Sequence, residues 1–159
     1  MSVHVREADF DDERDASGFI AVLDCYASSA VGGGQALSRD VRDRVVPMLR
    51  AHPTSLVLLA LVDDERVGIA VCFFGLSTFR ARPLLNIHDL AVLPEYQGKG
   101  VGPALLEAVE ERARREGCCK LTLEVLDDNT RARAVYRRFG FEDSVVGKSA
   151  TRFLVKPLQ

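Results

Sequence analysis

The segment Gln-Gly-Lys-Gly-Val-Gly, residues 97–102, stands between a strand-like stretch and a strongly amphipathic one. Residues 84–93 are mostly apolar, as in a buried strand, and Pro94 is expected to end that strand. Beyond the glycines, residues 105–113 place apolar side chains at helical spacing opposite charged ones. The chain is therefore expected to form a strand, a tight turn and a helix in direct succession, which constrains its architecture more than any other segment.

The remaining hydrophobic pattern predicts a mixed α/β, or α+β, protein. Strands are expected at residues 3–6, 56–62, 66–76, 84–93 and 120–126, with further strand-like character at 142–156. Helices are expected at residues 9–29, from Ser38 through Leu49 with an interruption at Pro47, after the glycines up to Gly117, and at 129–139. This order predicts a three-layer fold whose mixed, mostly antiparallel central sheet of about six or seven strands is flanked by about four helices.

Size and charge restrict the class of protein. With 159 residues the chain is expected to form one domain, 1–159, and its 47% hydrophobic and 28% charged residues are typical of a globular protein. A net charge of -2 offers no basic excess for nucleic acid. The N-terminus lacks the pattern of a secretion signal, and the longest apolar run, 56–62, is too short to cross a bilayer. A cytoplasmic protein without a nucleic-acid or membrane partner is expected.

No metal site is expected from the cysteines. They show neither C-x-x-C spacing nor a His/Cys cluster with the spacing of metal ligands, and reduced thiols are the expected state. The four are Cys25, Cys72, Cys118 and Cys119. An acyl-cysteine intermediate on the adjacent pair is disfavoured, because neither residue has a histidine nearby in the sequence.

The glycine segment can bind an anion. Glycines allow a backbone tight enough to point several N–H groups outward, and the following helix adds the positive end of its dipole. A pyrophosphate suits such a turn. The spacing is not that of the nucleoside-triphosphate loop, and it misses the dinucleotide fingerprint by one position. A glycine turn without a ligand and a binder of nucleotide phosphates remain alternatives.

Residues 97–102 match in full the motif [QR]-x-x-G-x-[GA], and with the preceding Leu-Ala-Val strand they resemble the GNAT superfamily of acyl-CoA-dependent N-acetyltransferases, as does the element order of nearly the whole chain. The resemblance implies acetyl-CoA as co-substrate. It implies that the strand binds the pantetheine arm of acetyl-CoA and that the glycine turn binds its pyrophosphate. The cofactor-binding residues it implies are Leu90, Ala91, Val92, Gln97, Gly98, Lys99, Gly100, Val101 and Gly102. Pro103 departs from the family pattern and removes one N–H donor.

Residues 129–141 resemble a second family segment, N-x-x-A-x-x-x-Y-x-x-x-G-F. By this resemblance Asn129 contacts the cofactor, and Tyr136 contacts it and acts as the general acid. A thiol with a pKa of about 8.5 leaves as thiolate, and a phenol with a pKa near 10 can donate a proton to it. The pattern alone also allows Tyr136 to be a core aromatic residue on a helical stripe.

His88 and Asp89, just before the Leu-Ala-Val strand, are the candidate bases for an attacking amine that is mostly protonated at neutral pH. Neighbours on a strand point to opposite faces, so both can face the substrate only if a bulge intervenes. A hydrogen-bonded pair without a chemical role, Glu124 and water remain alternatives.

The expected function is the transfer of an acetyl group from acetyl-CoA to a primary amine, by direct attack in a ternary complex. Ser77-Thr78-Phe79 resembles the polyamine- and thialysine-type branch of the superfamily, which makes a polyamine or an amino-acid-like amine a plausible acceptor, although His88 stands where that branch has glutamate. Residues 28–40 and 73–84 are expected to shape the acceptor pocket. The resemblance also implies a homodimer. The alternative is a non-catalytic acyl-CoA-binding or sensing module.

Overall fold

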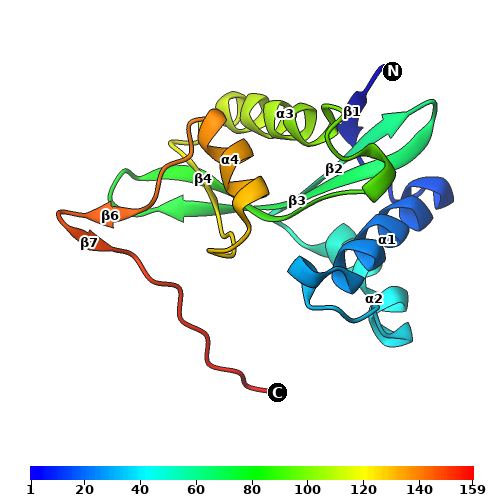
Figure 1. Ribbon diagram of the computed structural model, residues 1–159, viewed down its shortest axis with the longest axis horizontal. Helices are drawn as coiled ribbons and strands as arrows, with labels where there is room; N and C mark the ends of the chain where they lie inside the picture. The colour runs from blue at the N-terminus through cyan, green and yellow to red at the C-terminus, as the bar shows by residue number, and fades with distance from the viewer. The chain divides into compact units, whose positions relative to one another are not determined.

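The computed structural model describes residues 1–159, which divide into two compact units, Met1–Leu126 and Asp127–Gln159. The first unit holds five strands and three α-helices (Figure 1). Along the chain these are β1 (His4–Glu7), α1 (Glu13–Ser28), α2 (Arg39–Ala51), β2 (Ser55–Val62), β3 (Glu65–Ser77), β4 (Arg82–Val92), α3 (Val101–Arg115) and β5 (Leu121–Leu123), with short 3-10 turns η1 (Ala30–Gly32) and η2 (Pro94–Tyr96).

The central sheet has the strand order β1-β2-β3-β4-β5. Strands β1 to β4 form an antiparallel meander, and β5 pairs parallel to β4 after the crossover through α3. The predicted mixed, mostly antiparallel sheet is confirmed, with five strands in place of six or seven. β5 covers only part of the predicted segment 120–126, and the strands of the C-terminal region form a separate two-stranded sheet.

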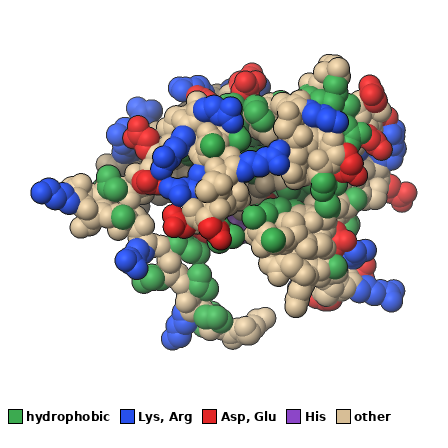
Figure 2. Space-filling view, viewed as in Figure 1, with side chains coloured by type: hydrophobic (Ala, Val, Ile, Leu, Met, Phe, Trp, Pro, Cys, Tyr) green, Lys and Arg blue, Asp and Glu red, His purple; other side chains and the backbone are tan.

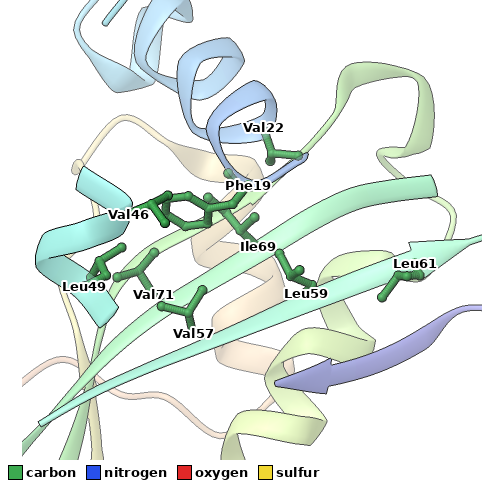
Figure 3. Close-up of a cluster of buried hydrophobic side chains, with 10 residues drawn as sticks. Phe19, Val22, Val46, Leu49, Val57, Leu59, Leu61, Ile69 and Val71 are labelled. Atoms are coloured by element: carbon green, nitrogen blue, oxygen red, sulfur yellow. The ribbon is translucent and has the colours of Figure 1, made fainter. Parts of the chain in front are cut away.

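Helices cover both faces of the central sheet, α1 and α2 on one side and α3 on the other (Figure 1). Nearly every residue of β2 is buried, as its continuous apolar run requires of a strand packed on two sides. On the first face, Phe19 and Val22 of α1 and Leu49 of α2 meet side chains of β2 and β3 (Figure 3). On the second, α3 buries Val101, Leu105, Leu106, Val109 and Ala113. The three predicted layers are therefore present.

The start of α1 is fixed by a buried carboxylate. Asp15 is fully buried and accepts hydrogen bonds from Arg6 at 2.6 and 2.9 Å, from Nε of Arg66 at 2.8 Å and from the N–H of Asp9 at 2.9 Å. Gly18, one turn later, lets the Arg66 side chain pass, because a Cβ at this position would lie 2.7 Å from the Cβ of Arg66. The network ties β1, α1 and β3 together.

Pro47 does not interrupt α2, contrary to the sequence expectation, and the helix runs continuously from Arg39 to Ala51. Proline removes one N–H donor, so the carbonyl of Asp43 loses its helical partner. Pro47 and Asp43 both lie on the exposed face of α2, where that carbonyl can bond to water. Val46 and Leu49, on the opposite side, are buried and hold the helix against the sheet.

The second unit contains α4 (Thr130–Arg138) and a hairpin of β6 (Val145–Val146) and β7 (Ser149–Ala150). The predicted helix at 129–139 is confirmed, with Gly140 just beyond its end at a φ of 90°. The hairpin turns at Gly147. Beyond it, the extended C-terminal segment exposes apolar side chains (Figure 2). No helix of the protein combines the length and apolar character needed to cross a membrane.

Candidate active site

A β-bulge in β4 places His88 and Asp89 at one pocket. Val71 of β3 pairs with Asp89 and the next residue, Cys72, pairs with Ile87, so His88 is one extra residue on β4. Such an insertion breaks the alternation of a regular strand and re-aims the side chains beside it. Both His88 and Asp89 line the same pocket. The bulge that the sequence pattern requires for His88 and Asp89 to face one side together is therefore present.

The outer edge of β4 loses its partner after the bulge. β5 pairs only with Leu85, Asn86 and Ile87, and the Asn86 amide holds the two strands together there by donating to Oγ1 of Thr122 at 3.0 Å. Beyond Ile87 this edge of β4 has no strand beside it. An edge with free peptide groups can bind an extended ligand as an added strand would bind.

The peptide groups of Val92 point to this free edge. The N–H of Leu93 donates to the carbonyl of Val67 on β3, and in an antiparallel pair successive residues alternate between facing the partner and facing away. Val92 therefore directs its N–H and C=O away from β3. Its carbonyl accepts a hydrogen bond of 3.0 Å from Nε2 of Gln97, which fastens the following turn to the end of β4.

The glycine turn leaves a run of amides available. Gly98 and Gly100 have φ values of 72° and 88°, a conformation that side-chain-bearing residues avoid. Gly100 is the N-cap of α3 and provides no side-chain cap. The N–H of Gln97 donates to the carbonyl of Pro94 at 3.3 Å, and the next N–H bonded to a backbone carbonyl is that of Ala104, which donates to Gly100 at 3.1 Å. The N–H groups of residues 98–102 thus project at the positive end of α3.

Pro103 lies in the first turn of α3, where a helix N–H has no partner within the helix. It reduces the number of donors without breaking the helix. Lys99 is exposed, with its Nζ 5.7 Å from the centre of the Tyr96 ring. The turn therefore adds a cationic side chain to its amides.

A pocket of about 360 Å³ lies between α1, α2 and strands β3 and β4. Its lining residues are Phe19, Leu23, Asp40, Val41, Arg44, Val45, Met48, Leu49, His52, Val71, Phe73, His88 and Asp89. The Phe73 ring stands edge-on to His52 and His88, with ring centres 4.9 and 5.6 Å away. Of the segments 28–40 and 73–84, expected to shape the pocket, only Asp40 and Phe73 line it. Sequence reasoning missed the α2 wall, although Val41, Val45 and Leu49 were visible as an apolar stripe.

Burial raises the pKa of Asp89 above the ordinary value of an aspartate, and the positive charge of His88 partly offsets this rise. Asp89 in turn acts on its neighbours. Burial and then its negative charge raise the pKa of Tyr26, and the same two causes raise the pKa of Cys72 to about 12. A carboxyl group with a raised pKa is a stronger base than an exposed aspartate, which suits the removal of a proton from an amine.

The other candidate residues have different surroundings. Glu124 is exposed just beyond β5 and does not line the pocket with His88 and Asp89. Asn129 is the N-cap of α4, and its side chain accepts from the N–H of Ala132 at 3.3 Å, which gives it a structural role. Tyr136 is half-buried on α4 in the second unit, with its ring 5.7 Å from that of Phe141. Burial raises the pKa of Cys118, which disfavours a thiolate nucleophile.

Comparison with known proteins gives consistent findings. A model of the acetyltransferase (GNAT) family matches residues 10–141. Thialysine N-epsilon-acetyltransferases from Bos taurus and Mus musculus are 39% and 35% identical to the chain over 77 residues, which are 48% of this chain and 45% of theirs. The chain thus spans less than half the length of these relatives. A transcriptional regulator from Bacillus halodurans has the same fold, with a TM-score of 0.77 and 21% identity over 95% of this chain and 100% of that one.

Proposed function

Because the chain belongs to the GNAT acetyltransferase family, we propose that it transfers the acetyl group of acetyl-CoA to a primary amine by direct attack in a ternary complex. One observation carries the proposal. The strand β4 has a partnerless edge that runs toward free amides at the start of α3, and its bulge presents His88 and Asp89 to a pocket. One strand thereby serves both a site for the acyl donor and a site for the acceptor.

The donor site fits coenzyme A in shape and charge. We assign Leu90, Ala91 and Val92 to the pantetheine arm, because their strand edge offers peptide groups, and the segment 97–102 to the pyrophosphate. A Cβ built at Gly100 or Gly102 meets no atom within 4 Å, so the turn has open space in front of it. Amides at a helix N-terminus bind phosphate oxygens. The bound donor supplies the thioester that the amine attacks.

The chemical step requires a base and a group that polarises the carbonyl. We assign the base to Asp89, with His88 beside it: a proton leaves the ammonium, the nitrogen forms a bond to the carbonyl carbon, and the carbon–sulfur bond breaks with its electron pair on sulfur. The N–H of Val92, directed to the free edge of β4, is suited to stabilise the developing oxyanion. Tyr136 is assigned to protonate the departing thiolate, and water and Glu124 remain the alternative bases.

The acceptor is proposed to be a small amine. The names of the two curated relatives specify acetyl transfer to a nitrogen of thialysine, and this supports an amine acceptor. A homodimer and a cytoplasmic location, without a metal and without nucleic-acid or membrane partners, remain predictions from the sequence.

Release of free thiol tests the function. The protein is incubated with acetyl-CoA and a panel of primary amines that includes thialysine, and free thiol is followed over time. The enzyme is expected to release thiol at a rate that depends on the amine concentration. A non-catalytic acyl-CoA-binding module would bind the coenzyme without amine-dependent release. A binder of nucleotide phosphates would be stabilised by ATP as strongly as by coenzyme A.

The acidic limb of the pH profile tests Asp89. Its raised pKa means that the carboxylate forms only above the ordinary aspartate value of about 3.9, so kcat/KM should fall at a correspondingly higher pH as the solution is acidified. Asp89→Asn is expected to remove this limb, and Asp64→Asn, at an exposed position, should retain it. The profiles of all variants are measured with the same amine, because deprotonation of the amine itself gives a second limb near pH 10. A limb that survives in Asp89→Asn would exclude Asp89 as the base.

A further inference from the structure

The walls of the pocket beside Asp89 are mainly apolar. Eight of the lining side chains are hydrophobic: Phe19, Leu23, Val41, Val45, Met48, Leu49, Val71 and Phe73. Figure 3 shows Phe19, Leu49 and Val71, from α1, α2 and β3, converging between the helices and the sheet. Met48 is 61% exposed and Val41 39% exposed, so part of this apolar surface is open to water and could be covered by a ligand.

The pocket offers a single unpaired carboxylate. Asp40 is neutralised by Arg44, with 3.0 Å between nitrogen and oxygen, and Asp24 on α1 is likewise paired with Arg42 at 2.5 Å. Asp89 forms no ion pair with a lysine or arginine, and His52 and His88 are the remaining titratable groups of the lining. One ammonium group can therefore find an unpaired carboxylate here, whereas a second one would have to compete with Arg44 for Asp40.

We propose that the pocket binds a primary monoamine carried on an apolar, aromatic body and discriminates against polyamines. The inference rests on the proposed function and narrows its acceptor. An ammonium placed at Asp89 is matched in charge. A second ammonium of a polyamine would lie among the eight hydrophobic side chains, where the remaining carboxylate, Asp40, is already paired with Arg44, and this is unfavourable.

The length and aromatic content of the pocket suit such a body. The lining residues of α2 and its C-cap run from Asp40 to His52, a wall of roughly 18 Å at 1.5 Å per residue. The Phe73 ring stands edge-on to both His52 and His88, and His88 is the residue that precedes Asp89 in the sequence. An aromatic ring attached by a short linker to the reacting amine can pack against Phe73 while its nitrogen reaches the bulge of β4.

Comparison of two amines tests the inference. Values of kcat/KM are measured with saturating acetyl-CoA for 2-phenylethylamine and for spermidine. The expected result is a preference for 2-phenylethylamine of about tenfold or more, since the second ammonium of spermidine would lose hydration against apolar side chains without gaining an unpaired carboxylate. A kcat/KM for spermidine that equals or exceeds that for 2-phenylethylamine would overturn the inference. Acetylation of thialysine without acetylation of either of these two amines would overturn it as well.

A charge placed at the mouth of the pocket sharpens the test. Met48→Glu adds a carboxylate at an exposed lining position and is expected to raise kcat/KM for spermidine by about two- to fivefold, as an exposed ion pair would. The value for 2-phenylethylamine should fall. Arg39→Gln lowers the net charge by the same amount on the opposite face of α2, where the side chain is 95% exposed, and should leave the ratio unchanged. An unchanged ratio in Met48→Glu would contradict the inference.

These outcomes separate the inference from the function on which it rests. If no amine releases thiol from acetyl-CoA, the proposed transferase activity fails together with the inference. If spermidine is acetylated and 2-phenylethylamine is not, the activity stands and only the assignment of the pocket is wrong.

Discussion

Replacement of Tyr136 by phenylalanine is expected to lower kcat by roughly ten- to a thousandfold while the Kd for coenzyme A stays nearly unchanged. The substitution removes only the phenolic hydroxyl, and the ring can keep its packing against Phe141 at 5.7 Å. A thiol with a pKa of about 8.5 departs as thiolate, and a phenol with a pKa near 10 assists by donating a proton or hydrogen bond to the sulfur as its negative charge develops. Single-turnover release of thiol measures the effect on the chemical step directly.

Tyr96 provides the matched control for the loss of a hydroxyl. Its phenol is hydrogen-bonded to Oε2 of Glu65 at 2.7 Å, and no part of the reaction is assigned to it. Tyr96→Phe is therefore expected to keep the kcat of the unaltered protein. If Tyr136→Phe and Tyr96→Phe are equally active, Tyr136 is a packing residue of α4 and the acid is water or another group.

Replacement of Asp15 by alanine is expected to lower the free energy of unfolding by about 3–5 kcal/mol, because breaking a buried ion pair leaves its partners uncompensated. Asp15 is 0% exposed, and its carboxylate faces Arg66, which is only 6% exposed, as well as Arg6. Urea denaturation followed by circular dichroism should show a midpoint lower by about 1 M or more. Asp43→Ala removes an exposed carboxylate from its pair with Arg39, away from this network, and should change the midpoint little.

The same network predicts how stability depends on pH. Hydrogen bonds from Arg6, opposed in part by burial, hold the pKa of Asp15 well below its usual range. The folded state thus binds the proton more weakly than the unfolded state, so the contribution of Asp15 is complete above the unfolded pKa of about 3.9 and declines as the pH falls below it. Asp15→Ala should flatten this decline. An equal decline in the variant would assign acid sensitivity to other carboxylates.

The elements around the glycine turn could be predicted because their signals are local. The apolar strand before Pro94, the glycine spacing at 97–102 and the helical stripe of α3 each depend on a few neighbouring residues, and all three are present in the structure. The antiparallel meander of β2 and β3 followed for the same reason from the turn at residues 63–65. These elements form the proposed donor site. The framework of that part of the site could therefore be predicted from the sequence.

Features that depend on partners distant in the sequence could not be predicted. The bulge at His88 arises from the pairing of β4 with β3, and the residues of β4 alone do not specify it. The continuity of α2 through Pro47 depends on which face of the helix is exposed. The acceptor pocket is formed by one side of α2 together with Phe73 and Asp89. The apolar stripe of α2 in the sequence does not reveal whether these side chains pack fully against the sheet or leave a cavity.

Titration calorimetry with coenzyme A tests most directly the central claim, that the amides of Gly98 to Gly102 hold its pyrophosphate. Gly100→Ala introduces a side chain at a φ of 88° and should weaken binding by about tenfold, because the turn must relax and move its amides. Gly117→Ala imposes similar strain at the other end of α3, at a φ of 76°, and should bind as the unaltered protein does. The predicted result is that the unaltered protein binds coenzyme A more tightly than ATP and that only Gly100→Ala weakens the binding of coenzyme A. No detectable heat with coenzyme A, or an equal loss in both variants, would contradict the claim.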